Sequence, residues 1–560
     1  MRNALCNTHG TEAALQTATR DFLSALIRIR VGLAALCPGF RASDSSIHDR
    51  SGEPVCRRAG RQRTVCFAMP LPDVDRLPLL APSLVRELGA RLRALGVERE
   101  AIAPFVRHGE HWLDRMRRPL RTFYLRQVRS PLLFALRLFV FMDPVTREEA
   151  MAALASDTLL SALLEVGLLV PRDAGLVCPF LLNVIEDQYV FCDDLSNRGE
   201  AVMGASATTA DLLRATWPVK LHVSVLDLGC GAGTAALMLA EGAAQVVGSD
   251  INPRAIVLAK LNLALSDRNN VTFVAGDLFA PVAGQRFDLI VAQPPFVSRP
   301  DSEEAVTFLH GGARGDELLL RILSELPAHL TPAGRAVFLA DFPRYDEVSP
   351  AERIRTALAE DNFDLLLFAS PPKDLGECVA HYAAARHPDL GEEYERAVHA
   401  HLAHLARLGV SELRATLFVL RATERAPWTH AVTTQAGAKP TGLQIERLIA
   451  AQDLLAGDSA TLQAASLVVP EGTRFARDET GQVRIELDAS RLIGGVTCSQ
   501  SGADLLTVVH ESPSVAAAVA KLAKRMKLDH AAGRAQILQG VRTALSEGLL
   551  ELELDVQVPA

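Results

Sequence analysis

Between residues 221 and 422, short, mostly apolar runs that are typical of strands alternate with stretches of helical periodicity. Seven such runs occur at residues 223–229, 245–251, 271–277, 287–293, 335–341, 363–369 and 414–421. Strands that are joined by crossover helices pair mainly in parallel and bury both faces of their sheet under helices. The pattern therefore predicts an α/β fold, a doubly wound open sheet of seven strands, with a ligand crevice at the carboxyl ends of the strands.

The size and composition of the chain limit what surrounds this sheet. At 560 residues the chain exceeds what one hydrophobic core usually serves, so several domains are expected. Hydrophobic residues make up 49% and charged residues 22% of the chain, which is typical of soluble globular proteins. The longest apolar stretch, residues 131–143, is about half of the roughly 20 residues that cross a bilayer. We therefore expect no membrane partner.

Charge and cysteine content exclude two further classes of protein. The formal net charge of -8 argues against a protein that grips nucleic acid mainly through its phosphates, because that mode needs a strongly basic face. Nine cysteines without a CxxC pair fit neither a disulfide framework nor a zinc site. The sequence thus predicts a cytoplasmic protein without a bound metal.

Changes in composition and periodicity divide the chain into five segments. The first segment is interpreted as a disordered or dispensable extension. The alternative is a targeting peptide, because the segment is rich in Arg and Ser. A helical, winged-helix-like domain follows, and its last part reads as two short strands that turn near Glu186. Next come the sheet domain, a connector and a small winged-helix-like domain. The five segments are residues 1–68, 69–195, 196–425, 426–469 and 470–560.

The first predicted strand of the sheet ends in the motif Asp-Leu-Gly-Cys-Gly-Ala-Gly at residues 227–233. Gly229, Gly231 and Gly233 allow a tight turn with positive φ and let a ligand approach the backbone. Nicotinamide dinucleotide folds use a similar loop, so the glycines alone do not identify the ligand. The leading Asp227 favours S-adenosylmethionine (SAM), because a sulfonium gains from a nearby anion whereas a pyrophosphate needs a clear path.

The next two predicted strands also end in acidic residues. A carboxylate at Asp250 can accept hydrogen bonds from both ribose hydroxyls, and Asp277 can accept one from an adenine amino group while Leu278 packs on the ring. Each Asp alone could simply cap a helix, but three consecutive acidic strand ends favour one adenosyl ligand. The predicted cofactor-binding residues are Asp227, Gly229, Gly231, Gly233, Asp250, Asn252, Asp277 and Leu278.

The fourth predicted strand ends in Gln-Pro-Pro-Phe at residues 293–296. Paired prolines cannot continue a β-ladder, so the chain must leave the sheet at Gln293 and turn its next side chains toward the crevice. Here the chain resembles the class I SAM-dependent methyltransferases of the small-domain type, which include release-factor glutamine N-methyltransferases and ribosomal RNA guanine N-methyltransferases. The resemblance covers residues 196–342 and implies a Rossmann-like seven-stranded core with SAM as the cofactor.

The resemblance also assigns Gln293, Pro294, Pro295 and Phe296 to the catalytic pocket. In these families the first position is Asn, Asp or Ser, which accepts a hydrogen bond from the target nitrogen, and the aromatic ring stacks on a planar amide or base. Gln293 departs from this pattern. Its side chain has one more methylene, so its amide can form the same hydrogen bond only if the substrate lies farther from the backbone of residue 293. The implied reaction is methylation of a nitrogen, with oxygen less favoured, on a protein or peptide, an RNA or a small molecule, by alignment more than by a strong base.

Two further segments lie near this pocket in the sequence. Residues 310–316 resemble the glycine-rich segment that shapes the substrate side in such enzymes. His310 and Arg314 are candidate substrate contacts there, and a helix-entry loop capped by Asp316 is the favoured alternative. The helical stretch at residues 394–408 carries His399, His401 and His404, which we interpret as part of a surface helix and not as a metal site.

The C-terminal segment leaves its role open. Its pattern resembles the small peptide-recognition domains of the pyrroloquinoline quinone chaperone type, although a domain for packing or dimerisation is favoured. The basic residues at 521, 524, 525 and 527 could touch nucleic acid, but such a run is usually solvated. Two competing functions remain: a catalytically weak or inactive SAM-binding scaffold that holds peptide or RNA, and a nicotinamide-dependent oxidoreductase, for which no dedicated residues are evident.

Overall fold

The computed structural model describes residues 71–552, apart from 104–121, 174, 195–199, 217–221, 267, 346–347, 359–361, 388–389, 478, 480–481 and 489–490. These residues belong to one unit, Cys66–Ala560. The predicted extension at residues 1–68 lies outside the described residues. None of the helices within the described ranges is long and apolar enough to cross a bilayer.

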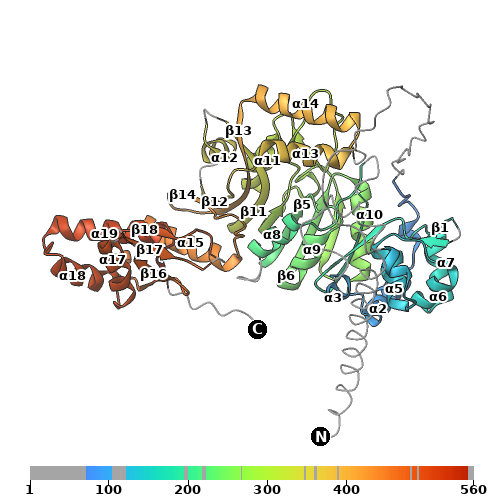
Figure 1. Ribbon diagram of the computed structural model, residues 1–560, viewed down its shortest axis with the longest axis horizontal. Coiled ribbons are helices and arrows are strands. Elements are labelled where there is room, and N and C mark those ends of the chain that lie inside the picture. The colour runs from blue at the N-terminus through green and yellow to red at the C-terminus, as the bar shows by residue number, and fades with distance from the viewer. Residues whose placement is uncertain are drawn as a thin grey trace, which may run out of the picture. The chain divides into compact units, whose positions relative to one another are not determined.

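An eight-stranded sheet forms the centre of the described fold (Figure 1). Its strand order is β14-β12-β13-β11-β8-β5-β6-β7, and all neighbours are parallel except β13, which is antiparallel to both β11 and β12. The central strand β8 is buried along almost its whole length, as expected for a strand covered on both faces. The strands are β5 (His222–Leu228), β6 (Ala243–Asp250), β7 (Val271–Ala275), β8 (Phe287–Ala292), β11 (Leu330–Tyr345), β12 (Phe363–Ala369), β13 (Val410–Ala422) and β14 (Thr429–Thr433).

The predicted α/β class and the seven predicted strands are confirmed. An eighth strand, β14, extends the sheet beside β12, although the sequence predicted only a connector over residues 426–469. The reason is that β14 has only five residues and buries only Val432. Edge strands of this kind lack the continuous apolar pattern of the inner strands.

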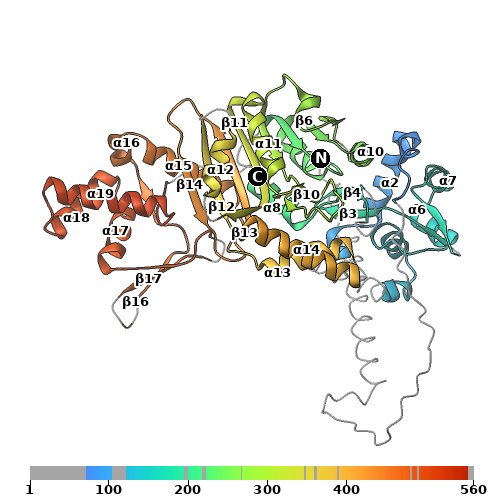
Figure 2. The same ribbon diagram turned by 90° about the horizontal axis from the view of Figure 1, so that it is seen from above.

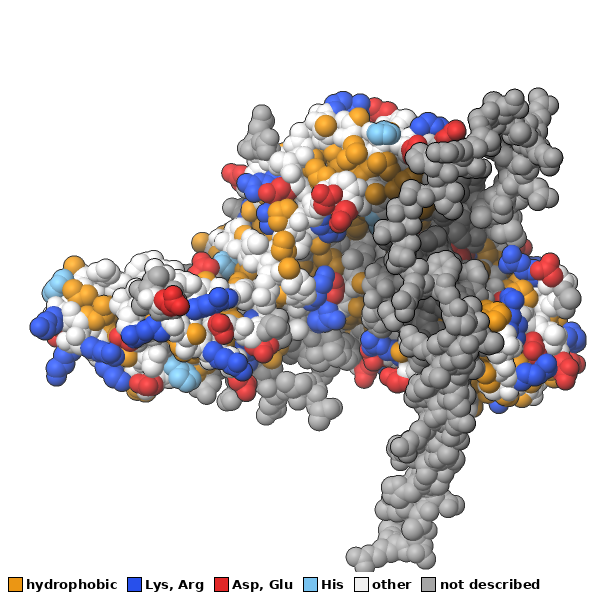
Figure 3. All heavy atoms as spheres, in the orientation of Figure 1, with side chains coloured by type: hydrophobic (Ala, Val, Ile, Leu, Met, Phe, Trp, Pro, Cys, Tyr) orange, Lys and Arg blue, Asp and Glu red, His pale blue; other side chains and the backbone are white. Residues whose placement is uncertain are grey.

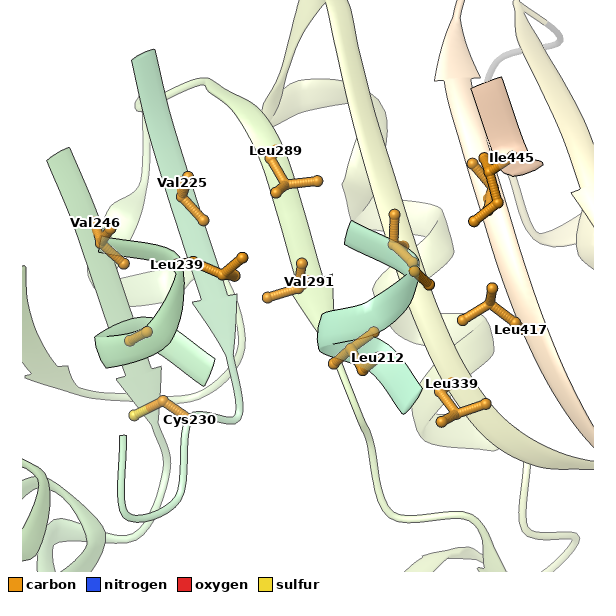
Figure 4. Packing of buried hydrophobic residues seen from close by; sticks show 14 of the residues in the cluster. Leu212, Val225, Cys230, Leu239, Val246, Leu289, Val291, Leu339, Leu417 and Ile445 are labelled. Atoms are coloured by element: carbon orange, nitrogen blue, oxygen red, sulfur yellow. The ribbon is translucent and has the colours of Figure 1, made fainter. Parts of the chain in front are cut away.

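Helices cover both faces of the sheet with separate apolar cores. On one face, residues of α8 (Ala207–Thr216), α9 (Thr234–Leu239), α10 (Pro253–Leu265) and α15 (Gly442–Ala456) pack against the strands, as Leu212, Leu239 and Ile445 show in Figure 4. On the other face, residues of α11 (Glu317–Glu325) and α12 (Pro350–Ala357) do so. Burial of both faces leaves only the strand ends free to build a site.

The N-terminal elements are helices followed by two hairpins. The predicted pair of strands with a turn near Glu186 is confirmed by the antiparallel pairing of β3 and β4. A second hairpin joins β1 to β2, and an isolated bridge between Val145 and Leu176 extends it. The elements are α2 (Pro82–Ala94), α3 (Arg99–Ile102), α5 (Pro131–Ala135), α6 (Arg147–Leu154), α7 (Asp157–Glu165), β1 (Val170–Arg172), β2 (Gly175–Val177), β3 (Leu181–Ile185) and β4 (Gln188–Cys192).

The C-terminal elements form their own apolar core, which α15 shares with the sheet. In α15, Ile445 and Ile449 pack in the sheet core, whereas Ala451 and Leu454 pack with the C-terminal helices. In Figure 3, the Lys and Arg side chains of these elements are interspersed with Asp and Glu on the face that is drawn. The elements are α16 (Ser459–Ala464), β15 (Leu467–Val468), β16 (Arg474–Arg477), β17 (Val483–Glu486), β18 (Val496–Cys498), α17 (Gln500–His510), α18 (Val515–Arg525), α19 (Ala531–Ser546) and β19 (Glu551–Leu552).

Asn262 in α10 fastens the β3–β4 hairpin to the sheet domain. Its Nδ2 donates to the carbonyl oxygens of Phe191 and Ala232, each at 2.9 Å, and its Oδ1 accepts from the backbone N–H of Phe191 at 2.7 Å. The side chain is fully buried. One amide therefore joins the hairpin, α10 and the glycine loop that precedes α9.

Replacing Asn262 by Ala should destabilise the protein, because three buried backbone groups lose their partner. We expect the free energy of unfolding, measured by urea denaturation, to fall by about 3 kcal/mol. The matched control is Lys260→Ala on the exposed side of the same helix, which should change it by less than about 0.5 kcal/mol. Equal effects of the two substitutions would contradict this role of Asn262.

Candidate active site

The loop that follows β5 brings the glycine motif to the carboxyl edge of the sheet. Gly229, Gly231 and Gly233 have φ values of 75°, 52° and 84°. A Cβ at Gly233 would lie 2.7 Å from Cζ of Phe273, so this glycine is required by packing as well as by its positive φ. At Gly229 a Cβ would meet nothing within 4 Å, which leaves open space over the loop.

Asp227 lies beneath this loop and is almost fully buried. Its Oδ2 accepts a hydrogen bond of 2.9 Å from the backbone N–H of Ala236, in the first turn of α9. Burial raises the pKa of Asp227 to about 7, because the charged form has lost its hydration, although the hydrogen bond from Ala236 opposes this effect. The carboxyl group is therefore partly protonated near pH 7.

Asp250 at the end of β6 ties the second strand end to the first. Its Oδ2 accepts from the N–H of Gly231 and its Oδ1 from the N–H of Asn252, each at 2.8 Å. Burial raises its pKa, and the two backbone hydrogen bonds lower it. Asn252 caps α10 through Oδ1, which accepts from the N–H of Arg254 at 3.0 Å, and its Nδ2 donates to the carbonyl oxygen of Glu200.

The third strand end is held close to the second, because the N–H of Gly276 donates to the carbonyl oxygen of Asp250 at 2.9 Å. Asp277 is half-exposed, and its Oδ2 forms an ion pair of 2.7 Å with Arg321 of α11. Leu278 has a φ of 45° and packs against the apolar core that lies between the sheet and the helices α11 and α12. Asp277 therefore needs to share its carboxylate between Arg321 and any ligand.

The double proline after β8 turns the chain out of the sheet as expected, and the amide of Gln293 lies against the start of α8. Its Nε2 donates to Oγ1 of Thr208, and its Oε1 accepts from Oγ1 of Thr209 at 3.5 Å. Ser206 completes this hydroxyl cluster, with its Oγ 2.7 Å from Oγ1 of Thr208. Both ends of the Gln293 amide are thus held by α8.

One large cleft, about 3280 Å³ in volume, joins these groups. All the sequence-predicted site residues line it except Gly233, which instead packs against Phe273. Acidic side chains outnumber lysines and arginines about threefold among the described residues that line the cleft. Within the ranges that the structure describes, no group of three or more His, Cys, Asp or Glu side chains could hold a metal ion.

Sequence reasoning missed the insertion between β12 and β13 as part of the site. It forms α13 (Leu375–Arg386) and α14 (Glu392–Leu408), which lie side by side in Figures 1 and 2 and line the cleft. Tyr382 and Lys373 both donate to Asp341, at 2.8 Å and 2.6 Å, in the part of β11 that extends beyond its pairing with β8. This cluster anchors the start of the insertion to the sheet.

The prediction that the α14 histidines belong to a surface helix was wrong for two of them. His401 and His404 are buried, and Nε2 of His404 lies 2.6 Å from the carbonyl oxygen of Ala313. They share one helix face with Ala397 and Leu405, which are also buried. The spacing of these four residues is the signal in the sequence that could have identified a packed helix.

The structure separates the two candidates in the glycine-rich segment. His310 lines the cleft, whereas the Arg314 guanidinium lies 4.3 Å from the ring centroid of Tyr345 and does not line the cleft. Asp316 occupies the N-cap position of α11 as expected, but its side chain does not cap that helix. It forms an ion pair with Arg353 instead.

Comparisons with known proteins converge on this part of the chain. Residues 202–336 match the family model of the methyltransferase small domain. A putative protein N5-glutamine methyltransferase of Methanocaldococcus jannaschii is 39% identical over 115 residues, which is 20% of this chain and 57% of that protein. The release factor glutamine methyltransferase of Geobacter sulfurreducens is 39% identical over 122 residues, which is 20% of this chain and 43% of that protein.

Two further proteins are similar to part of this chain. A ribosomal RNA small subunit methyltransferase C of Alcanivorax borkumensis is 34% identical over 20% of this chain and 30% of its own length. A ribosomal protein L11 methylase of Lactobacillus delbrueckii is similar in structure over 28% of this chain and 67% of that chain, at 25% identity and a TM-score of 0.21. The chain spans about half the length of the first two relatives. The family model thus matches the part of the chain that contains the glycine loop, Asp250, Asp277 and residues 293–296.

Proposed function

We propose that this protein is a SAM-dependent methyltransferase that acts on an amide nitrogen of a protein. The observation that carries the proposal is the meeting of the glycine loop, Asp250 and residues 293–296 in one cleft. Two of the relatives are named as glutamine methyltransferases, one of proteins and one of a release factor. The catalytic and cofactor-binding roles that follow are part of this proposal.

The residues at the strand ends fit SAM. Each carboxylate oxygen of Asp250 uses one lone pair for a backbone N–H and retains another for a ribose hydroxyl. The open space at Gly229 admits the amino acid part of the ligand close to the backbone. Asp227, whose ionised form is disfavoured by burial, gains a compensating positive charge from the bound cation.

The charge of the cleft favours a protein acceptor over an RNA. An RNA substrate brings phosphates, which need lysines and arginines around the site. The described residues that line this cleft instead carry about three carboxylates for each Lys or Arg. A neutral amide in a polypeptide enters such a cleft without that repulsion.

SAM supplies an electrophilic methyl group, so the protein has to align the acceptor nitrogen more than activate it. Gln293 is suited to this task because Thr208 and Thr209 fix the plane of its amide. The remaining lone pair on its Oε1 can accept a hydrogen bond from the acceptor N–H. Phe296, which is only partly buried, offers a flat surface on which a planar amide can stack.

The flanking segments are proposed to position the acceptor protein. The order of helices followed by a hairpin, with the bridge from Val145 to Leu176, supports a winged-helix-like unit over residues 69–195. The helices and hairpin of residues 470–560 support a second small domain of similar kind. We keep the cytoplasm as the proposed compartment because of the cysteine usage of the chain.

Isothermal titration with SAM tests cofactor binding. Wild-type protein should bind, and Asp250→Ala should weaken binding at least tenfold, because two ribose hydroxyls and the N–H of Gly231 lose their acceptor. Glu424→Ala is the control, since this exposed residue follows β13 at the opposite edge of the sheet. No detectable SAM binding to wild type would refute the proposal. Binding without methyl transfer to any cell extract would favour a non-catalytic scaffold.

The affinity for SAM should depend on pH through Asp227. Its pKa of about 7 in the free protein means that below this pH a proton must leave before the cation gains an anionic neighbour. The Kd for SAM should therefore rise as pH falls from 8 to 6, by up to about tenfold per pH unit below the pKa. Asp227→Asn should show a smaller dependence over the same range. Identical pH profiles for the two proteins would exclude this role.

Gln293→Ala should lower kcat by about 100-fold, since loss of alignment at the reacting atom has effects of this size. Its affinity for SAM should not change. Thr208→Val should give a smaller loss, and Thr208→Ser, which keeps the hydroxyl, should retain activity. The measurement is transfer of labelled methyl groups from SAM to proteins of a cell extract. Full activity of both Gln293→Ala and Thr208→Val would remove Gln293 from the mechanism.

A further inference from the structure

His310 is held beside the Pro-Pro-Phe segment by backbone pairing. The short strand β10 (His310–Gly312) pairs in parallel with β9 (Val297–Ser298), and His310 lies opposite Val297. The glycines that follow permit this close approach. A Cβ at Gly311 would lie 2.4 Å from the carbonyl oxygen of Pro295, and one at Gly315 would lie 2.6 Å from that of Phe296. The histidine is thus fixed next to the proposed catalytic residues.

The two ring nitrogens of His310 differ in their surroundings. Nδ1 accepts a hydrogen bond of 3.0 Å from the backbone N–H of Val306. A neutral ring that accepts at Nδ1 carries its proton on Nε2. Nε2 is buried and has no hydrogen-bond partner among the described residues. Burial, helped by Arg386, His401 and Arg299, lowers the pKa of His310 to about 4, so the ring is neutral near pH 7.

A buried N–H donor without a partner is unusual, because it has lost its hydration and gained nothing. His310 lines the cleft together with Gln293 and Phe296. Among the described residues, His310 does not belong to any group of three or more His, Cys, Asp or Glu side chains that could hold a metal ion. A neutral Nε2–H can only donate, so the partner that it lacks is a hydrogen-bond acceptor.

We propose that Nε2–H of His310 donates to the carbonyl oxygen of the acceptor amide. This inference rests on the proposed function and adds a substrate-orienting residue to it. The amide is then held at both ends of its plane, at the nitrogen by Oε1 of Gln293 and at the oxygen by His310, with Phe296 against its face. A site with this pair of groups selects a carbonyl next to the nitrogen and disfavours a simple amine.

The alternative is that His310 only supports its loop through Nδ1, and two substitutions separate the roles. His310→Asn places an amide oxygen near the position of Nδ1, so the bond from Val306 is retained while the inner donor is lost. His310→Gln places an amide nitrogen near the position of Nε2, so the donor is retained while the loop bond is lost. His430→Asn is the matched control. His430 in β14 also has a buried Nε2 without a partner in the described part of the chain, and it does not line the cleft.

The first measurement compares methyl transfer to extract proteins by these full-length variants, with SAM affinity measured for each. We expect the rate at limiting extract to fall about 10- to 100-fold in His310→Asn and much less in His310→Gln, with SAM affinity unchanged. His430→Asn should match wild type. If His310→Asn is active and His310→Gln is impaired, the inference is overturned and the proposed function is unaffected.

The second measurement needs no turnover. N-acetylglutamine methylamide is titrated into protein that is saturated with S-adenosylhomocysteine, and the Nε2–H signal of His310 is followed by NMR after labelling of the histidines. The signal is assigned by its loss in His310→Phe. A downfield shift of the Nε2–H signal supports the inference. If the signal does not shift at a saturating concentration of the amide, the inference is overturned. If wild type transfers no methyl group to extract, the proposed function fails, and this titration alone decides the role of His310.

Discussion

Every part of the candidate site depends on parallel strands that end at one edge of a sheet and are tied together there by backbone hydrogen bonds. The N–H groups of Gly229 and Cys230 donate to the carbonyl oxygen of Ser249, and the N–H of Gly276 donates to that of Asp250. These bonds fix three strand ends without using the side chains that a ligand needs. Both faces of the sheet are packed under helices. Cofactor geometry is thereby set by the fold itself.

The acceptor side is built differently, from side chains that reach across elements. Gln293 is longer than the Asn, Asp or Ser that the resemblance predicts, and the hydroxyls of Thr208 and Thr209 hold its amide. An extra methylene adds a rotatable bond, and the hydrogen bonds to α8 remove that freedom again. The departure in sequence is therefore matched by partners on a different helix, which a motif alone does not reveal.

The cofactor half of the fold was predictable because its signals are local. Short apolar runs, glycines with positive φ and a double proline each impose one backbone conformation. The missed features depend on long-range contacts. Strand β14 exists only because β12 offers a free edge, and His404 is buried only because α14 folds back onto Ala313. Asp316 could be placed at the start of α11, but its pairing with Arg353 could not be inferred from its position in the sequence.

Residues 202–336, which match the methyltransferase small-domain model, are the part of the chain whose geometry is dictated by local sequence. The insertion with α13 and α14 lies beyond that range. Tyr382 and Lys373 bind it to Asp341, and His404 contacts the carbonyl oxygen of Ala313 in the glycine-rich segment. This wall of the cleft is thus held by residues that lie outside the range of the family match.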